Sequence, residues 1–144
     1  HDIKKFPTDQ SLVFCQFVKE IQIVQDALTH AGVSNASISG QTSQNNRRTI
    51  IEQAQTGSIN TLVIQINAAS VGLNLQFANR VFIISPSWNP TTELQAIARA
   101  HRIGQTKHVH VIRYLSTLPT TTSTDLYKHH IQFKKHQIIK DTLH

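Results

Sequence analysis

The run SLVFCQF, Ser11–Phe17, decides the fold, because it is short, apolar and rich in residues that favour β-strands. A second short strand is expected over Ala36–Ser39, and two further apolar runs lie at Thr61–Ile66 (TLVIQI) and Arg80–Ser85 (RVFIIS). Strands that read as continuous apolar runs are typically buried on both faces. We therefore expect a parallel sheet with helices on both sides.

Apolar residues at helical spacing follow the first strand. Phe17, Ile21, Val24 and Leu28 recur with this period, and Gly32 is a good stop for the helix. The chain therefore alternates from strand to helix after its first apolar run.

Two further helices are expected from capping and stop signals. Ser43 can cap a helix that runs to about Gln55 and closes at Gly57, and Pro90 suits the first turn of another helix. A fifth strand with alternating polarity is expected over His108–Leu115. This order predicts a three-layer α/β fold with a mainly parallel sheet and right-handed crossovers.

The chain of 144 residues is long enough for one domain with a core. We expect a polar tail over residues 1–10, the main domain over 11–115, a linker over 116–122 and a C-terminal helix over 123–144. Because the chain begins at His1 and contains no methionine, we expect it to be part of a longer protein.

Composition narrows the function classes. The formal net charge is +6, and residues 99–113 contain four Lys or Arg, three His and no acid, which favours a polyanionic partner.

Cys15 is the only cysteine, so no disulfide can form within the chain, and a reducing, intracellular compartment fits this composition. The residues around Cys15 are apolar, which indicates a buried, inert thiol rather than a nucleophile. No apolar run is long enough to span a membrane, and no signal peptide is visible.

Nine histidines raise the question of a metal site. The sequence has one cysteine and no histidine pair at helical spacing backed by a carboxylate, so no zinc pattern is recognised. We expect no bound metal in this chain.

Candidate chemistry lies in the loops that follow the strands, because ligands of parallel sheets bind at the carboxyl ends of strands. The stretch SGQTS, Ser39–Ser43, follows a strand and opens a helix, and its small and hydroxyl residues suit a phosphate. The same residue types are also typical of an ordinary loop that ends in a helix cap, so this alternative stays open. Arg47 and Arg48 follow, and at least one of them is expected to be a solvated surface charge. Gly72, after the third strand, allows a tight turn or close approach of a ligand.

Arg99 and Arg102 lie three positions apart and are both expected on the helix that starts at Pro90, with Gln95 one turn before Arg99 on the same face. A paired guanidinium suits the negative charge of a transferring phosphoryl group, although such a pair is more often a solvated helix face. The chain lacks the phosphate-binding motif G-x-x-x-x-G-K-[ST], and no Asp-Glu pair follows a strand to hold magnesium. The chain therefore has candidate arginines for phosphoryl transfer but no motif that binds the phosphates or the metal, which indicates one half of a shared site.

In order, these stretches resemble the second RecA-like lobe of Swi/Snf-type DNA translocases in helicase superfamily two. SLVFCQF resembles motif IV, ISGQTSQNNRR resembles the following G-x-T/S-x(4)-R element, AASVGLNL resembles motif V, and QAIARAHRIGQ resembles motif VI. The loop PSWNP resembles the corresponding loop in one branch of the family, which contains the helicase-like transcription factor and its yeast DNA-repair relatives. The final helix resembles the C-terminal brace of the family.

The resemblance implies roles for individual residues. Arg99 and Arg102 would be arginine fingers, and Gly72 and Gln95 would contribute to the nucleotide cleft. The residues implied in DNA binding are Gly40, Thr42, Arg47, Asn67 and Ser70. ATP and Mg²⁺ would be held mainly by a first lobe outside this chain. The implied partners are that lobe, duplex DNA and nucleosomes or other DNA-bound proteins, with a nuclear location in a cellular source.

The chain departs from the family pattern before V-G-L-N-L, where the family often has S-T-x-A-G-G. Gln65 and Ile66 stand at the first two of these positions, and Ile66 cannot supply a hydroxyl to a phosphate. Ser87 replaces the usual acid before W-N-P. These departures leave a non-catalytic DNA- or protein-binding module as an alternative. An RNA helicase lobe is a further alternative, against which the HRIGQ ending argues.

Overall fold

The computed structural model describes residues 2–70, 72–85, 87 and 89–114, and the side chain of Ser70 is outside this description. The predicted linker 116–122 and C-terminal helix 123–144 lie outside the described residues.

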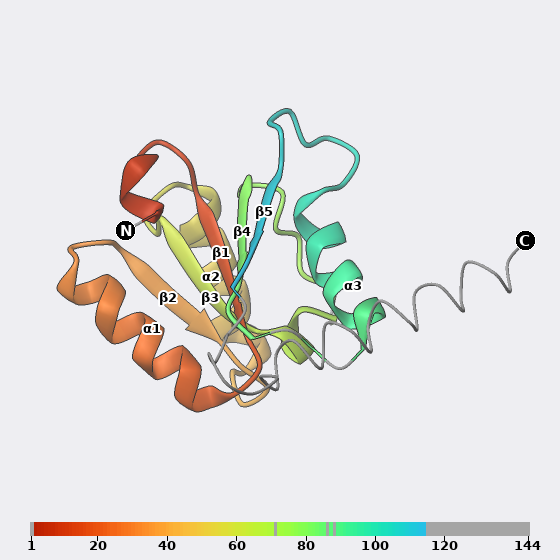
Figure 1. Cartoon of the computed structure of the whole chain (residues 1–144), viewed down its shortest axis with the longest axis horizontal. Helices are drawn as coiled ribbons and strands as arrows, with labels where there is room; N and C mark the ends of the chain where they lie inside the picture. The colour runs from red at the N-terminus through yellow and green to blue at the C-terminus, as the bar shows by residue number, and fades with distance from the viewer. Residues whose placement is uncertain (1, 71, 86, 88, 115–144) are drawn as a thin grey trace, which may run out of the picture.

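Five parallel strands form one sheet in the order β2-β3-β1-β4-β5 (Figure 1). Their bounds are β1 Ser11–Cys15, β2 Asn35–Ile38, β3 Thr61–Gln65, β4 Arg80–Ile83 and β5 His110–Arg113. Three α-helices connect them, namely α1 Val18–His30, α2 Gln44–Gln55 and α3 Pro90–Ala100, and two short 3-10 helices lie at Ile3–Lys5 (η1) and Ile66–Ser70 (η2). The predicted α/β fold with a parallel sheet is confirmed.

Helices cover both faces of the sheet, as Figure 1 shows for α1 in front of the strands and α2 behind them. On one face Val13, Cys15 and Val63 pack with Ile21 and Leu28 of α1. On the other face Leu12, Phe14 and Leu62 belong to a cluster that includes Ala96 and Ala100 of α3, and Ile50 of α2 packs against it. Successive residues of β1 therefore enter opposite cores, as the period of two in a strand requires.

Local signals start each helix where the sequence predicts. The Ser43 hydroxyl accepts a hydrogen bond from the Asn46 N–H at the start of α2, and the Asn89 side chain accepts from the Thr91 N–H at the start of α3. Pro90 occupies the first turn of α3, where its missing N–H costs no hydrogen bond. The Glu20 carboxylate accepts from the Phe17 N–H at 3.0 Å before α1.

The segment before β1, expected as a polar tail, contacts the domain. The Asp9 carboxylate accepts a hydrogen bond from Arg80 Nε at 2.8 Å, and the Phe6 ring lies 3.4 Å below the Arg80 guanidinium. The hydrogen bond from Arg80 holds the pKa of Asp9 below its usual value. This ion pair connects the segment to the amino end of β4.

Within the described residues, none of the helices combines the length and apolar character that crossing a bilayer requires.

Phe14 and Phe17 form a matched pair for testing the core, since Phe14 is 0% exposed and Phe17 is 57% exposed. Phe14→Ala is expected to lower the free energy of unfolding by about 3–5 kcal/mol, because it leaves a cavity beneath the central strand. Phe17→Ala is expected to change it by less than about 0.5 kcal/mol. Urea unfolding followed by circular dichroism measures both, and equal effects would contradict the described burial.

Candidate functional site

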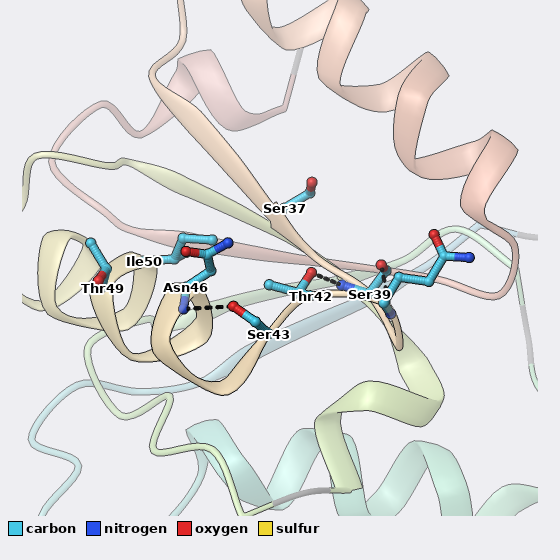
Figure 2. Close-up of a pocket in the computed structure, with 8 residues that line it drawn as sticks. Ser37, Ser39, Thr42, Ser43, Asn46, Thr49 and Ile50 are labelled. Atoms are coloured by element: carbon cyan, nitrogen blue, oxygen red, sulfur yellow. Dashed lines mark hydrogen bonds between the residues drawn. The ribbon is translucent and has the colours of Figure 1, made fainter.

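A polar pocket of about 470 Å³ lies where β2 passes into α2 (Figure 2). Hydroxyl and amide side chains dominate its lining, which consists of Ser37, Ser39, Gln41, Thr42, Ser43, Asn46, Thr49 and Ile50. The first turn of α2 opens beside it, and backbone N–H groups there favour an anion. This pocket contains the predicted phosphate-binding loop, with Thr42 among its lining residues.

Arg47 holds this loop from inside the protein. Its side chain is buried, with Nε donating to the Thr42 carbonyl at 3.0 Å and Nη2 donating to the Ser39 carbonyl at 2.9 Å. The Thr42 hydroxyl in turn accepts from the Ser39 N–H at 3.0 Å. The contacts described for Arg47 therefore position the loop. Its neighbour Arg48 is the solvated charge, since it is exposed and pairs with Glu52 on the surface of α2.

Gly40 lies at the exposed tip of the same loop, and its N–H donates to Oε1 of Gln65 at 3.0 Å. Its φ is not positive, and an added Cβ would meet only Gln65 Oε1 within 4 Å, at 3.6 Å. Neither the backbone conformation nor the packing within the lobe therefore requires a glycine there. The side chain of Gln65 lies beside Gly40, which is otherwise exposed.

A second pocket, of about 440 Å³, lies at the end of α3. Its described lining includes Gln95, Arg99 and Arg102, so the structure brings these three predicted residues together. The expectation that both arginines belong to one helix is wrong, because α3 ends at Ala100 and Arg102 lies in the following turn. The backbone leaves the helical conformation at His101, whose φ is −90° and ψ is 81°.

The two pockets lie at opposite ends of the strands. We call the side of the sheet where the strands end its carboxyl edge and the side where they begin its amino edge. Gly40 and Thr42 follow β2 at the carboxyl edge, whereas α3 starts at that edge and runs back toward the amino end of β5 (Figure 1). Eleven residues of helix cover about 15 Å, so Arg99 lies far from the carboxyl ends of the strands. This placement follows from the order of elements, because a helix between parallel strands must reverse direction.

The remaining predicted residues lie in η2, which follows β3, and just after it. Asn67 is exposed in η2, directly after β3, and η2 packs against α3. Ser70 ends η2. Gly72 has φ +70°, a conformation that strongly favours glycine, but it is not among the residues that line the pocket of Arg99. The role of Gly72 in a nucleotide cleft therefore stays a prediction.

Gln105 holds the turn that carries Arg102, a role that sequence reasoning missed. Its Nε2 lies 2.8 Å from the Gln76 carbonyl, 3.1 Å from the Ala78 carbonyl and 3.2 Å from the Ala100 carbonyl. The Gln76 side chain also bonds to this turn, since its Nε2 donates to the Ile103 carbonyl. The bond to Ala100 satisfies a carbonyl at the end of α3, where helices leave acceptors without partners, and the other bonds connect the turn to the segment before β4. Gln76 and Ala78 lie 29 and 27 positions from Gln105 in sequence, so no local signal reveals these two contacts.

Glu93 is a second residue whose role the sequence did not reveal. It is 1% exposed, and its carboxylate accepts from the Ser87 N–H at 2.8 Å and from Arg113 Nε at 3.1 Å. The two bonds connect the first turn of α3 to the loop before it and to β5. A buried carboxylate is tolerated because these donors replace its hydration.

Within the described part of the chain, no group of three or more His, Cys, Asp or Glu side chains is arranged to hold a metal ion. His108 and His110 contact each other edge to face, with ring centroids 4.9 Å apart, at the edge strand.

Comparison with known proteins identifies the family. Residues 2–104 match the helicase conserved C-terminal domain family. The chain belongs to this helicase family. The relatives include the DNA repair protein rad8 of Schizosaccharomyces pombe, which is 40% identical over 74% of this chain and 10% of its own length. They also include the DNA repair protein RAD5 of Cryptococcus neoformans, which is 40% identical over 76% of this chain and 9% of its own length.

This helicase domain thus spans about a tenth of the length of these curated relatives. Among solved structures, the C-terminal part of the Fun30 ATPase domain matches with a TM-score of 0.73 at 22% identity, covering 94% of this chain and 49% of the solved chain. These findings confirm the predicted resemblance to the C-terminal lobe of Swi/Snf-type helicases, and the structural match confirms the fold.

Arg47 and Arg48 offer a direct test of how the polar loop of this helicase domain is held. Arg47→Ala removes two hydrogen bonds from a charged, buried donor and is expected to lower the free energy of unfolding by about 2–3 kcal/mol. Arg48→Ala removes an exposed ion pair and is expected to cost less than about 0.5 kcal/mol. Urea unfolding measures the difference, and equal losses would show that Arg47 does not hold the loop.

Cys15 is expected to be inert in the folded domain. Burial, with a smaller contribution from the charge of Glu20, raises the pKa of its thiol to about 12. Its thiolate is therefore scarce at pH 8, and the buried sulfur is also inaccessible. Modification by a disulfide reagent is expected only after unfolding in urea. Because the folded pKa is raised, this group should also lower stability as the pH rises above about 9. Rapid labelling of the native protein at pH 8 would contradict this environment.

Proposed function

We propose that this chain is the C-terminal motor lobe of an ATP-dependent translocase acting on duplex DNA. The observation that carries the proposal is the shared pocket of Gln95, Arg99 and Arg102, on the edge of the sheet opposite to the polar loop of Gly40 and Thr42. The lobe would present arginines to a nucleotide at one edge and hydrogen-bond donors to DNA at the other.

The residues of the arginine pocket fit one side of an ATP site. Two guanidinium groups can neutralise charge on the terminal phosphate, and Ile103, fully exposed beside them, offers an apolar contact to a neighbouring lobe. No sequence motif in the chain supplies a phosphate cradle, so a first lobe would hold ATP and Mg²⁺. ATP supplies the phosphoryl group that water attacks, and the role of Arg99 and Arg102 is to stabilise the charge that develops during transfer.

The polar loop supports contact with the DNA backbone. The hydroxyl groups that line the pocket beside α2 and the exposed Gly40 can accommodate a phosphate, while Arg47 keeps the loop in shape. The proposed DNA contacts of Thr42, Asn67 and Ser70 belong to the same edge. Such contacts read the backbone rather than the base sequence, which suits a motor that moves along DNA.

The proposal extends to the whole protein. The lobe alone would hydrolyse no ATP, because the first lobe would hold the nucleotide. The names of the relatives, which include DNA repair proteins and the protein CHROMATIN REMODELING 24 of Arabidopsis thaliana, support a nuclear location and nucleosomes or other DNA-bound proteins as partners.

Arg99→Ala and Arg102→Ala, introduced separately into the full-length protein, test the arginine role. Each is expected to lower DNA-stimulated ATP hydrolysis by about 10³–10⁵-fold, the range known for arginine fingers, with duplex DNA binding retained. Arg48→Ala is the matched control and is expected to leave the rate unchanged, because Arg48 is exposed on α2. An undiminished rate in both finger variants would refute the assignment and favour a non-catalytic binding module.

A further inference from the structure

Gln65 ends β3, and its side chain joins two neighbouring loops at the carboxyl edge of the sheet. Its Oε1 accepts from the Gly40 N–H at 3.0 Å, and its Nε2 donates to the Gln16 carbonyl at 3.5 Å. Since one partner is a donor and the other an acceptor, only this orientation of the carboxamide satisfies both. Gln65 therefore connects the loops that follow β1 and β2.

This contact covers the backbone group that the proposed function assigns to DNA. Gly40 is exposed, and Gln65 Oε1 is the one atom that an added Cβ at Gly40 would meet within 4 Å. A carboxamide oxygen and a phosphate oxygen are both acceptors, so they compete for the single N–H of Gly40. A phosphate can reach this amide only after the side chain of Gln65 has moved away.

We propose that Gln65 is a latch whose side-chain oxygen holds the position of a DNA phosphate oxygen at Gly40, and that binding of duplex DNA displaces it. The inference rests on the proposed function, because it concerns the same loop and the same ligand. Breaking the internal hydrogen bond costs free energy, so the latch lowers the affinity of the lobe for DNA.

The latch is next to the segment that leads toward the arginines. Gln65 is followed directly by η2, Ile66–Ser70, and η2 packs against α3, which carries Arg99. The Leu75 N–H also donates to the Arg99 carbonyl at 3.2 Å, so the chain after η2 is bonded to the end of α3. Gln65 is thus adjacent in sequence to an element that packs against the helix of Arg99.

The test measures equilibrium binding of a short blunt-ended DNA duplex to the full-length protein without nucleotide. Gln65→Ser shortens the side chain so that it cannot reach Gly40, and it is expected to tighten binding by about 2- to 10-fold, the value of one hydrogen bond. Gln65→Ala is expected to do the same, and it decides the question if the serine variant fails to fold. Gln65→Glu retains the acceptor but adds negative charge beside the phosphate, so binding is expected to weaken.

Gln22→Ala is the matched control, because Gln22 is exposed on α1 and its side chain donates to Asp26 of the same helix. Unchanged or weaker binding in the serine and alanine variants would overturn the latch, as would unchanged or tighter binding in Gln65→Glu.

Arg47→Ala distinguishes failure of the latch from failure of the proposed DNA site. If Arg47→Ala leaves DNA affinity unchanged, the polar loop is not a DNA site and both proposals fail for this loop. If Arg47→Ala weakens DNA binding while Gln65→Ser does not tighten it, the loop is still a DNA site and only the latch is wrong.

Discussion

The whole lobe depends on the burial of β1 between two parallel neighbours. Ser11 pairs with Thr61 of β3 on one side and with Arg80 of β4 on the other, and all five residues of β1 are buried. A strand enclosed in this way must be covered on both faces, and parallel neighbours must be joined by crossovers. The positions of α1, α2 and α3 follow from these two constraints.

The same constraint separates the two candidate sites. Because every strand runs in one direction, each connecting helix begins at the carboxyl edge and ends near the amino edge. Residues at the start of α2 therefore belong to one edge, and residues at the end of α3 belong to the other. This separation places the hydroxyl-lined pocket and the guanidinium-lined pocket at opposite ends of one small domain.

The fold was largely predictable from the sequence, because apolar periodicity and caps are local signals. Ser43, Asn89 and Pro90 start helices by interactions within a few residues. The arginines of the α2 segment were harder, since Arg47 and Arg48 are adjacent and chemically identical. Only the position of Arg47 above the Ser39–Thr42 loop distinguishes the buried residue from the exposed one. The turn at His101, which removes Arg102 from α3, was likewise missed, because a residue distant in sequence, Leu75, donates its N–H to the Arg99 carbonyl at the end of that helix.

The sequence by itself determined the order of strands and helices, the family and the group of residues that includes Arg99 and Arg102, since spacing and motifs are properties of the chain. The tertiary structure alone decided which polar groups far apart in sequence meet. Gln65 lies 25 positions from Gly40, and Gln105 lies 29 positions from Gln76. Such contacts depend on sheet register and on how the loops return, and neither the period of a strand nor the cap of a helix contains that information.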